Sequence, residues 1–148
     1  MKIAIASDHA GFQLKSFIKE RLTGEGHEFR DFGTNSEVSM DYPDAVHPLA
    51  EAVETGHFQF GIVLSGSGNG VAITANKYNG IRAALCWNDE IVRLARMHNN
   101  ANVLALPARF IENEDGLRFS RIFLETPFEG GRHLVRVEKI SKVITKRI

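Results

Sequence analysis

The chain has 148 residues and one cysteine, and its eighteen lysine and arginine residues balance eighteen acidic ones. This length is sufficient for one domain with its own core, so we expect a single domain over residues 1–148. The balanced charge gives no net field that would recruit nucleic acid, and a lone cysteine excludes an internal disulfide and suits a reducing compartment. Because no long apolar span is present and the N-terminal run is too short for a signal peptide, we expect a cytoplasmic protein without a membrane partner.

Apolar runs of strand length alternate with helical patterns along the chain. The expected order is a strand at Lys2 to Ser7, a helix from Phe12 to Thr23, a strand at His27 to Phe32, a helix from Pro43, a strand around Ile62-Val63-Leu64, a helix from Val71 to Lys77, a strand at Ile81 to Cys86, a helix after an Asn88 N-cap, a strand at Val103 to Leu106, and a helix from Asn113 or Glu114. This alternation predicts a three-layer α/β/α sandwich around a five-stranded parallel, Rossmann-like sheet.

The C-terminal segment carries an apolar stripe after a Gly130-Gly131 break. The stripe recurs at nearly helical spacing and comprises Val135, Ile140, Val143, Ile144 and Ile148. An apolar stripe needs a surface to cover it, so we expect this helix to pack on a neighbouring subunit.

A glycine-rich turn follows the third expected strand, in the order Ser65-Gly66-Ser67-Gly68-Asn69-Gly70. Its glycines let the backbone approach a ligand, and free amides at a helix start attract anions. The turn lacks the Lys-Ser/Thr of a Walker loop, and Val71 stands where the dinucleotide fingerprint continues, so ATP or NAD fits poorly. The pattern favours a small phosphorylated or enolate-forming ligand, and the alternative is a tight turn that binds nothing.

Further polar residues follow the other strands. Asp8 and His9 come after the first strand and Arg109 after the fifth, and the carboxyl ends of parallel strands share one edge of a sheet. A carboxylate beside an imidazole suits acid–base chemistry, although an N-cap aspartate next to an exposed histidine has the same spacing.

The remaining candidates have plain alternatives. His98 lies at a helix end, where an imidazole can cap carbonyl groups, and Arg132 and Arg136 share a helix face that either clamps a phosphate or is simply solvated. Cys86 reads as a small core residue. The six histidines show no metal-ligand spacing, so we expect neither a metal nor a cofactor.

Taken together, the motifs resemble the type B ribose-5-phosphate isomerases and the related galactose-6-phosphate isomerase subunits. The resemblance covers nearly the whole chain and is carried by Ala6-Ser-Asp-His-Ala-Gly11, Asp41-Tyr-Pro43, Gly66-Ser-Gly-Asn-Gly70, Ala75-Asn-Lys77, Gly80-Ile-Arg-Ala83, His98-Asn-Asn-Ala-Asn-Val103, and Glu129-Gly-Gly-Arg-His133 with Arg136. It implies metal-free interconversion of an aldose phosphate and a ketose phosphate through a cis-enediolate. The site would be shared between two subunits of a homodimer or homotetramer.

The resemblance also implies roles for individual residues. His98 and Asp8 would open the sugar ring, and Ser67 would contact the sugar beside them. Tyr42 would line the sugar pocket. The enediolate oxygens would be held by Gly66, Gly68, Asn69, Gly70 and Asn99, and the phosphate by His9, Arg109, Arg132 and Arg136.

One departure concerns the base that moves the proton between carbons 1 and 2. Related proteins carry a cysteine at the position of Ser65, or a glutamate at that of Val71, and this chain has neither. A serine hydroxyl needs an adjacent base to act. Three explanations stay open: Ser65 is activated or replaced as base by another group, the position was altered to trap a ligand, or the protein binds sugar phosphates without turnover. We expect an isomerase acting on ribose 5-phosphate, with a six-carbon sugar phosphate as an open possibility.

Overall fold

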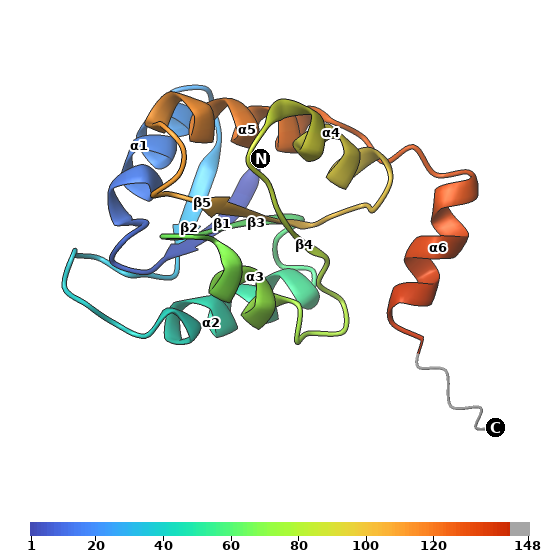
Figure 1. Cartoon of the computed structure of the whole chain (residues 1–148), viewed down its shortest axis with the longest axis horizontal. Helices are drawn as coiled ribbons and strands as arrows, with labels where there is room; N and C mark the ends of the chain where they lie inside the picture. Colours follow the sequence, from blue (N-terminus) through green and yellow to red (C-terminus); the bar gives the residue numbers. More distant parts are fainter. Residues whose placement is uncertain (143–148) are drawn as a thin grey trace.

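The computed structural model describes residues 1–142, which form five strands and six helices (Figure 1). In chain order they are β1 (Lys2–Ser7), α1 (Phe12–Thr23), β2 (Glu28–Asp31), α2 (Tyr42–Glu54), β3 (Phe60–Ser65), α3 (Asn69–Ala75), β4 (Ala83–Leu85), α4 (Asp89–Met97), β5 (Val103–Pro107), α5 (Asn113–Glu125) and α6 (Arg132–Ile140). No helix in this part of the chain is long and apolar enough to cross a membrane.

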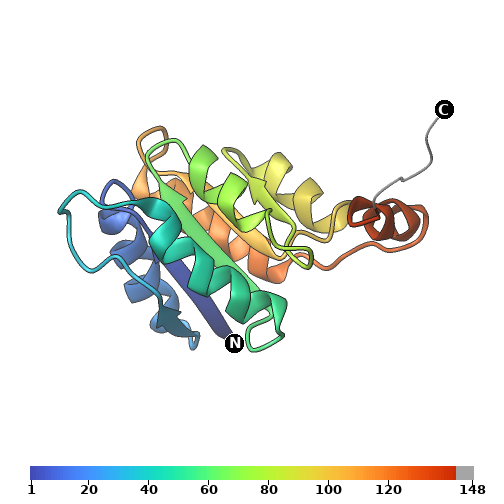
Figure 2. The same cartoon turned by 90° about the horizontal axis from the view of Figure 1, so that it is seen from below.

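All strands of the sheet are parallel, and their order is β2-β1-β3-β5-β4. Helices α1, α4 and α5 cover one face, and α2 and α3 cover the other, which makes three layers (Figures 1 and 2). β3 lies at the centre, and all six of its residues are buried because helices cover both faces. The predicted fold class is confirmed.

Several element boundaries follow from local chemistry that the sequence contains. The Asn88 side chain accepts a hydrogen bond from the Ile91 amide at the start of α4, as an N-cap does. Pro43 lies in the first turn of α2, where its missing N–H costs nothing. The expected inner face of α2 is buried, with Val46 and Leu49 fully enclosed.

Several element boundaries differ from the prediction. β4 begins at Ala83 rather than Ile81, because the Arg82 amide donates to the Asn102 side chain instead of joining the ladder. β2 begins one residue after His27, because the His27 amide closes α1 by donating to Leu22, and it ends at Asp31 rather than Phe32. Finally, β4 ends at Leu85 rather than Cys86, β5 extends to Pro107 rather than ending at Leu106, and α3 spans Asn69–Ala75 rather than Val71 to Lys77.

Helix α6 stands apart from the three layers at one end of the molecule (Figures 1 and 2). Its side chains Leu134, Val135 and Ile140 are 45 to 59% exposed, and His133 is its only buried residue. The exposed apolar side chains agree with the expectation that a second surface covers this helix. Val143, Ile144 and Ile148 of the predicted stripe lie outside the described residues.

Candidate active site

A hollow of about 510 Å³ opens at the carboxyl ends of β1 and β3, where the switch in strand order places ligand sites in such sheets. Seven of the predicted site residues line this hollow. They are Asp8, Tyr42, Ser65, Gly66, Ser67, Gly70 and Arg109, with Phe110 as an addition that the sequence did not indicate.

The glycine turn forms the floor of this hollow. Gly68 has a φ of +76°, a left-handed conformation that favours glycine, and a Cβ there would lie 2.5 Å from the Leu85 side chain. The Gly68 amide donates to Ser65 Oγ (3.0 Å) and the Asn69 amide to Ser67 Oγ (3.3 Å). Two of the amides predicted to bind a ligand are therefore engaged by the serines of the same turn.

Asp8 and His9 leave β1 in different directions. Asp8 is 8% exposed and lines the hollow, and its Oδ1 accepts from the Gly11 amide (3.0 Å). His9 lines an adjoining hollow, and its Nδ1 accepts from the Met40 amide (3.3 Å), which places the proton of the neutral ring on Nε2. Asp8 thus has the structural role of closing the turn before α1, and its acid–base role stays a prediction.

Arg109 connects the two hollows and lines both of them. Its amide donates to the Gly66 carbonyl (3.0 Å), and its guanidinium lies so close to Gly66 that a Cβ there would be 3.0 Å from Nη1. Across the turn, the Tyr42 ring packs over Gly70 in the same way. The turn therefore needs glycines at these positions to leave room for an arginine and a tyrosine that both face the hollow.

Within residues 1–142, no basic side chain is hydrogen-bonded to the hydroxyl at position 65. Ser65 is 5% exposed, and within residues 1–142 its Oγ has one hydrogen bond, from the Gly68 amide. Cys86 does not replace it, because this thiol is buried in the core and burial raises its pKa to about 12. The prediction that Cys86 is a core residue is confirmed.

The other predicted residues lie at the opposite edge of the sheet. His98 caps the C-terminus of α4, four residues before Asn102, whose carbonyl accepts from the Gly61 amide at the start of β3. The hollow lined by Asp8 and Ser65 lies beyond the other end of β3. A strand of six residues spans about 20 Å, so His98 lies about that far from the hollow. One chain thus brings Asp8 and Ser65 together but does not bring His98 to them.

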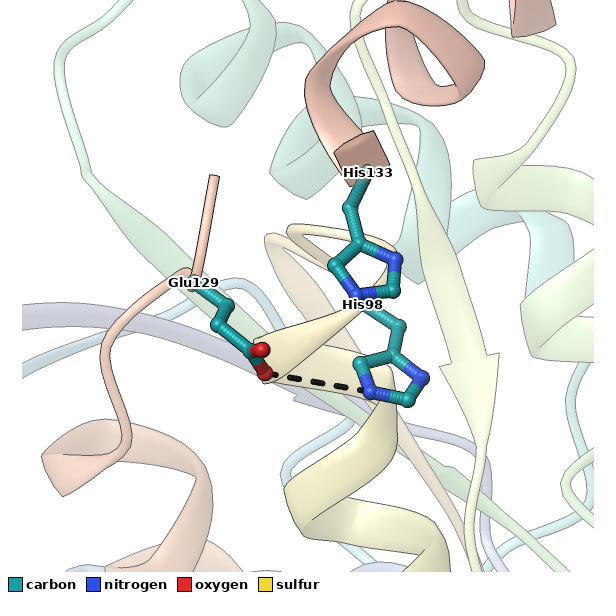
Figure 3. Close-up of side chains that lie close together, drawn as sticks. All are labelled: His98, Glu129 and His133. Carbon is teal, nitrogen blue, oxygen red and sulfur yellow. Dashed lines mark ion pairs between the residues drawn. The ribbon is translucent and has the colours of Figure 1, made fainter. Parts of the chain in front are cut away.

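His98 lies beside two further side chains, those of Glu129 and His133 (Figure 3). The rings of His98 and His133 are stacked with centroids 4.1 Å apart, and His98 Nε2 lies 3.8 Å from Glu129 Oε2. Burial, with His98 and Arg132 nearby, lowers the pKa of His133 below its ordinary value. Sequence spacing missed Glu129 and His133 as functional candidates, because they are more than thirty positions from His98.

Asn99, Arg132 and Arg136 belong to this same end of the molecule. Asn99 follows His98 directly, and both arginines are exposed on α6. They are four residues apart and so share a helix face, as predicted. The predicted site is therefore divided into two groups, one at each edge of the sheet.

Comparison with known proteins shows the family of the chain. The sequence profile described as ribose/galactose isomerase matches residues 3–140 of the chain. The chain belongs to the ribose/galactose isomerase family. The expected family resemblance is thereby confirmed.

Relatives and solved structures of this isomerase family match the chain over nearly its full length. Ribose-5-phosphate isomerase B of Escherichia coli is 40% identical over 146 residues, which is 99% of this chain and 98% of the relative. A crystal structure of a Thermotoga maritima ribose 5-phosphate isomerase superposes with a TM-score of 0.94 at 51% identity, covering 96% of this chain and 98% of that one. The Mycoplasma genitalium isomerase B, crystallised with ribulose-5-phosphate, superposes with a TM-score of 0.91 at 40% identity and covers 95% and 94%.

Proposed function

We propose that this protein is an aldose–ketose isomerase that interconverts ribose 5-phosphate and ribulose 5-phosphate. The observation that carries the proposal is the hollow at the ends of β1 and β3, where a carboxylate, a glycine turn and an arginine converge in a chain of this family. The substrate is taken from the relatives named ribose-5-phosphate isomerase and from the one crystallised with ribulose-5-phosphate. The lone buried thiol fits a reducing compartment, so we place the enzyme in the cytoplasm.

The reaction needs a base, a stabilised oxyanion and a held phosphate. A base removes the proton from carbon 2 of the open-chain aldose, and the carbonyl oxygen at carbon 1 takes up the negative charge. The base then returns the proton to carbon 1, while the hydroxyl proton on the oxygen of carbon 2 moves to the oxygen of carbon 1, so that carbon 2 becomes the carbonyl of the ketose. Amide and hydroxyl donors fixed around the turn stabilise that charge as it develops. His9 and Arg109 border the adjoining hollow and provide donors for the phosphate.

We infer that Asp8 is the base in this chain. It is the one carboxylate among the residues that line the described hollow, and its Oδ1 carries a single hydrogen bond from a backbone amide. Ser65, in contrast, accepts a bond from the turn and has no base beside it in residues 1–142. This assignment extends the role in ring opening that the family resemblance gave to Asp8.

The separation of the two groups supports a site that is completed by a second subunit. His98, Asn99, Arg132 and Arg136 lie about one strand length from the hollow in the same chain, so they reach a hollow only across an interface. The exposed apolar side chains of α6 give such an interface a hydrophobic surface. We propose a homodimer, or a tetramer built from it, in which His98 opens the sugar ring and the two arginines bind the phosphate.

A second candidate function is favoured by the state of Ser65. Because its hydroxyl is engaged and unactivated, the chain would bind sugar phosphates without turnover if Asp8 is not a base. The test is turnover of ribose 5-phosphate by the metal-stripped protein, with deuterium incorporation from solvent at the exchanging carbon followed by NMR. The proposal predicts turnover with exchange, and clear binding with neither would establish the binding function.

Substrate length is tested in the same assay. One methylene-sized difference is worth about 1–3 kcal/mol of discrimination, so we expect allose 6-phosphate to be a poorer substrate by about 10- to 200-fold. Faster turnover of the six-carbon sugar would reassign the substrate.

A further inference from the structure

The fold gathers three metal-ligating side chains that are far apart in the sequence (Figure 3). His98 comes from the end of α4, Glu129 from the loop before α6, and His133 from the first turn of α6. One ligand atom from each lies within 4.8 Å of the other two. We call these residues the His–Glu–His cluster.

His133 provides independent evidence for a ligand. This residue is 7% exposed, and its Nε2 is buried without a hydrogen-bond partner in the described part of the protein. That nitrogen faces His98 and Glu129 (Figure 3). A buried polar atom without a partner is costly, and a bound ion would satisfy it.

Hydrogen bonds from the Arg96 side chain and one backbone hydrogen bond already hold the two segments of the cluster together. Arg96 is buried, and its guanidinium donates to the Ala101 carbonyl (2.6 Å) and the Asn100 side chain (3.0 Å), just after His98. The same guanidinium donates to the Thr126 carbonyl (3.0 Å), and the Glu129 amide donates to the Met97 carbonyl (3.1 Å). The segments that carry the three ligands are therefore fixed to each other without a metal.

We propose that the His–Glu–His cluster binds a divalent transition-metal ion of the zinc class. Two imidazoles and one carboxylate are a ligand set for zinc that leaves a fourth position open. Imidazole nitrogen selects such ions over magnesium and calcium, which prefer oxygen, and this selectivity matters because Arg132 lies beside the cluster and repels all cations.

Binding requires one movement. The two rings are nearly parallel, with an interplanar angle of 12°, so their nitrogen lone pairs do not point at a common ion. His98 is 37% exposed and has room to turn, whereas His133 is enclosed. The ion therefore draws His98 out of the stack and toward Glu129.

Occupation of the cluster has a consequence that rests on the proposed function. A metal-bound His98 cannot exchange a proton with the cyclic sugar, so the ion inhibits the isomerase reversibly.

The test uses the full-length protein, stripped of metal with a chelator and titrated with Zn²⁺ by calorimetry and with Co²⁺ by visible absorption. We expect one ion per chain and an intense tetrahedral cobalt spectrum. His133→Ala and the exposed Glu129→Gln should each weaken Zn²⁺ binding by about 10- to 100-fold, while the control His57→Asn, at a surface position outside the cluster, should not. Absence of binding, or equal affinity in all three variants, would overturn the proposal.

Turnover of ribose 5-phosphate in the same samples separates the site from its consequence. Loss of activity with Zn²⁺ and its return with chelator support inhibition through His98. Zn²⁺ bound at the cluster with unchanged turnover would uphold the metal site and overturn both the inhibition and the assignment of His98 to ring opening.

Discussion

At the scale of single residues, the side chain at position 65 determines which group is available as the base. Ser65 Oγ accepts a hydrogen bond from the Gly68 amide. The serine therefore stabilises the glycine turn, at a position where a reactive side chain would otherwise stand. Asp8 lines the same hollow and is the base in the proposed mechanism. In that proposal, a carboxylate at the end of β1 transfers the proton.

The variant Ser65→Cys tests this division of roles. If Asp8 is the base, a thiol at position 65 should change turnover of ribose 5-phosphate by less than about tenfold, because the proton-transfer step does not use it. The comparison is kcat of the variant against kcat of the wild type, with Asp8→Asn as the inactive reference. A rise of several orders of magnitude would show that the native chain lacks a working base.

The thiol of Cys86 should be almost inert. Because its pKa is raised to about 12, the thiolate at pH 8 is on the order of one molecule in ten thousand, and alkylation requires the thiolate. We expect iodoacetamide to modify the native protein at least about a thousandfold more slowly than a free thiol with a pKa of about 8.5, and faster as the pH rises. The Ser65→Cys variant is the control, since its added thiol faces the hollow, and rapid modification of the wild type would contradict the core assignment.

At the scale of elements, the turn between β3 and α3 combines two constraints. Gly68 is required by the backbone conformation, and Gly66 by the Arg109 side chain that lies against it. The two glycines therefore serve different purposes, and replacing each of them by alanine should have a different effect.

Gly68→Ala should destabilise the fold, whereas Gly66→Ala should mainly impair binding. A Cβ at position 68 meets both a left-handed φ and the Leu85 and Leu106 atoms, which together should lower the free energy of unfolding by about 2–3 kcal/mol. A Cβ at position 66 meets only the movable end of Arg109, so the urea midpoint should stay near that of the wild type while inhibition by inorganic phosphate weakens. Equal stability of the two variants would refute the distinction.

Most of the strands and helices could be predicted from the sequence, because their apolar patterns are local. The ranges of β1 and α1 were predicted to the residue, because β1 is an unbroken apolar run and α1 has a clear apolar stripe. The start of β4 was missed, because the Arg82 backbone bonds to the Asn102 side chain, a contact twenty residues away that no local pattern contains. The His–Glu–His cluster was missed for the same reason, since only the fold unites α4 with the start of α6.

At the scale of the whole molecule, the residues of the proposed site form two separate groups within one chain. The hollow with Asp8 and the segment with His98 lie at opposite edges of the sheet, and α6 extends from the body with exposed apolar side chains. The family resemblance implied a shared site, and the direction of α4 agrees with this proposal. Helix α4 runs antiparallel to the strands, so its C-terminus with His98 lies at the opposite edge of the sheet from the hollow.

Mixing two inactive variants tests this claim most directly. Asp8→Asn impairs the hollow and His98→Asn impairs the other group, so a dimer of one chain of each has one site with both defects and one with none. After mixing at equal concentration, unfolding and refolding together, about a quarter of the sites should be intact, and turnover of ribose 5-phosphate should recover to about that fraction of wild type. The pair His98→Asn and Arg132→Ala, both from the second group, should recover nothing. Activity no higher than that of the separate variants in the first mixture would contradict a site shared between subunits.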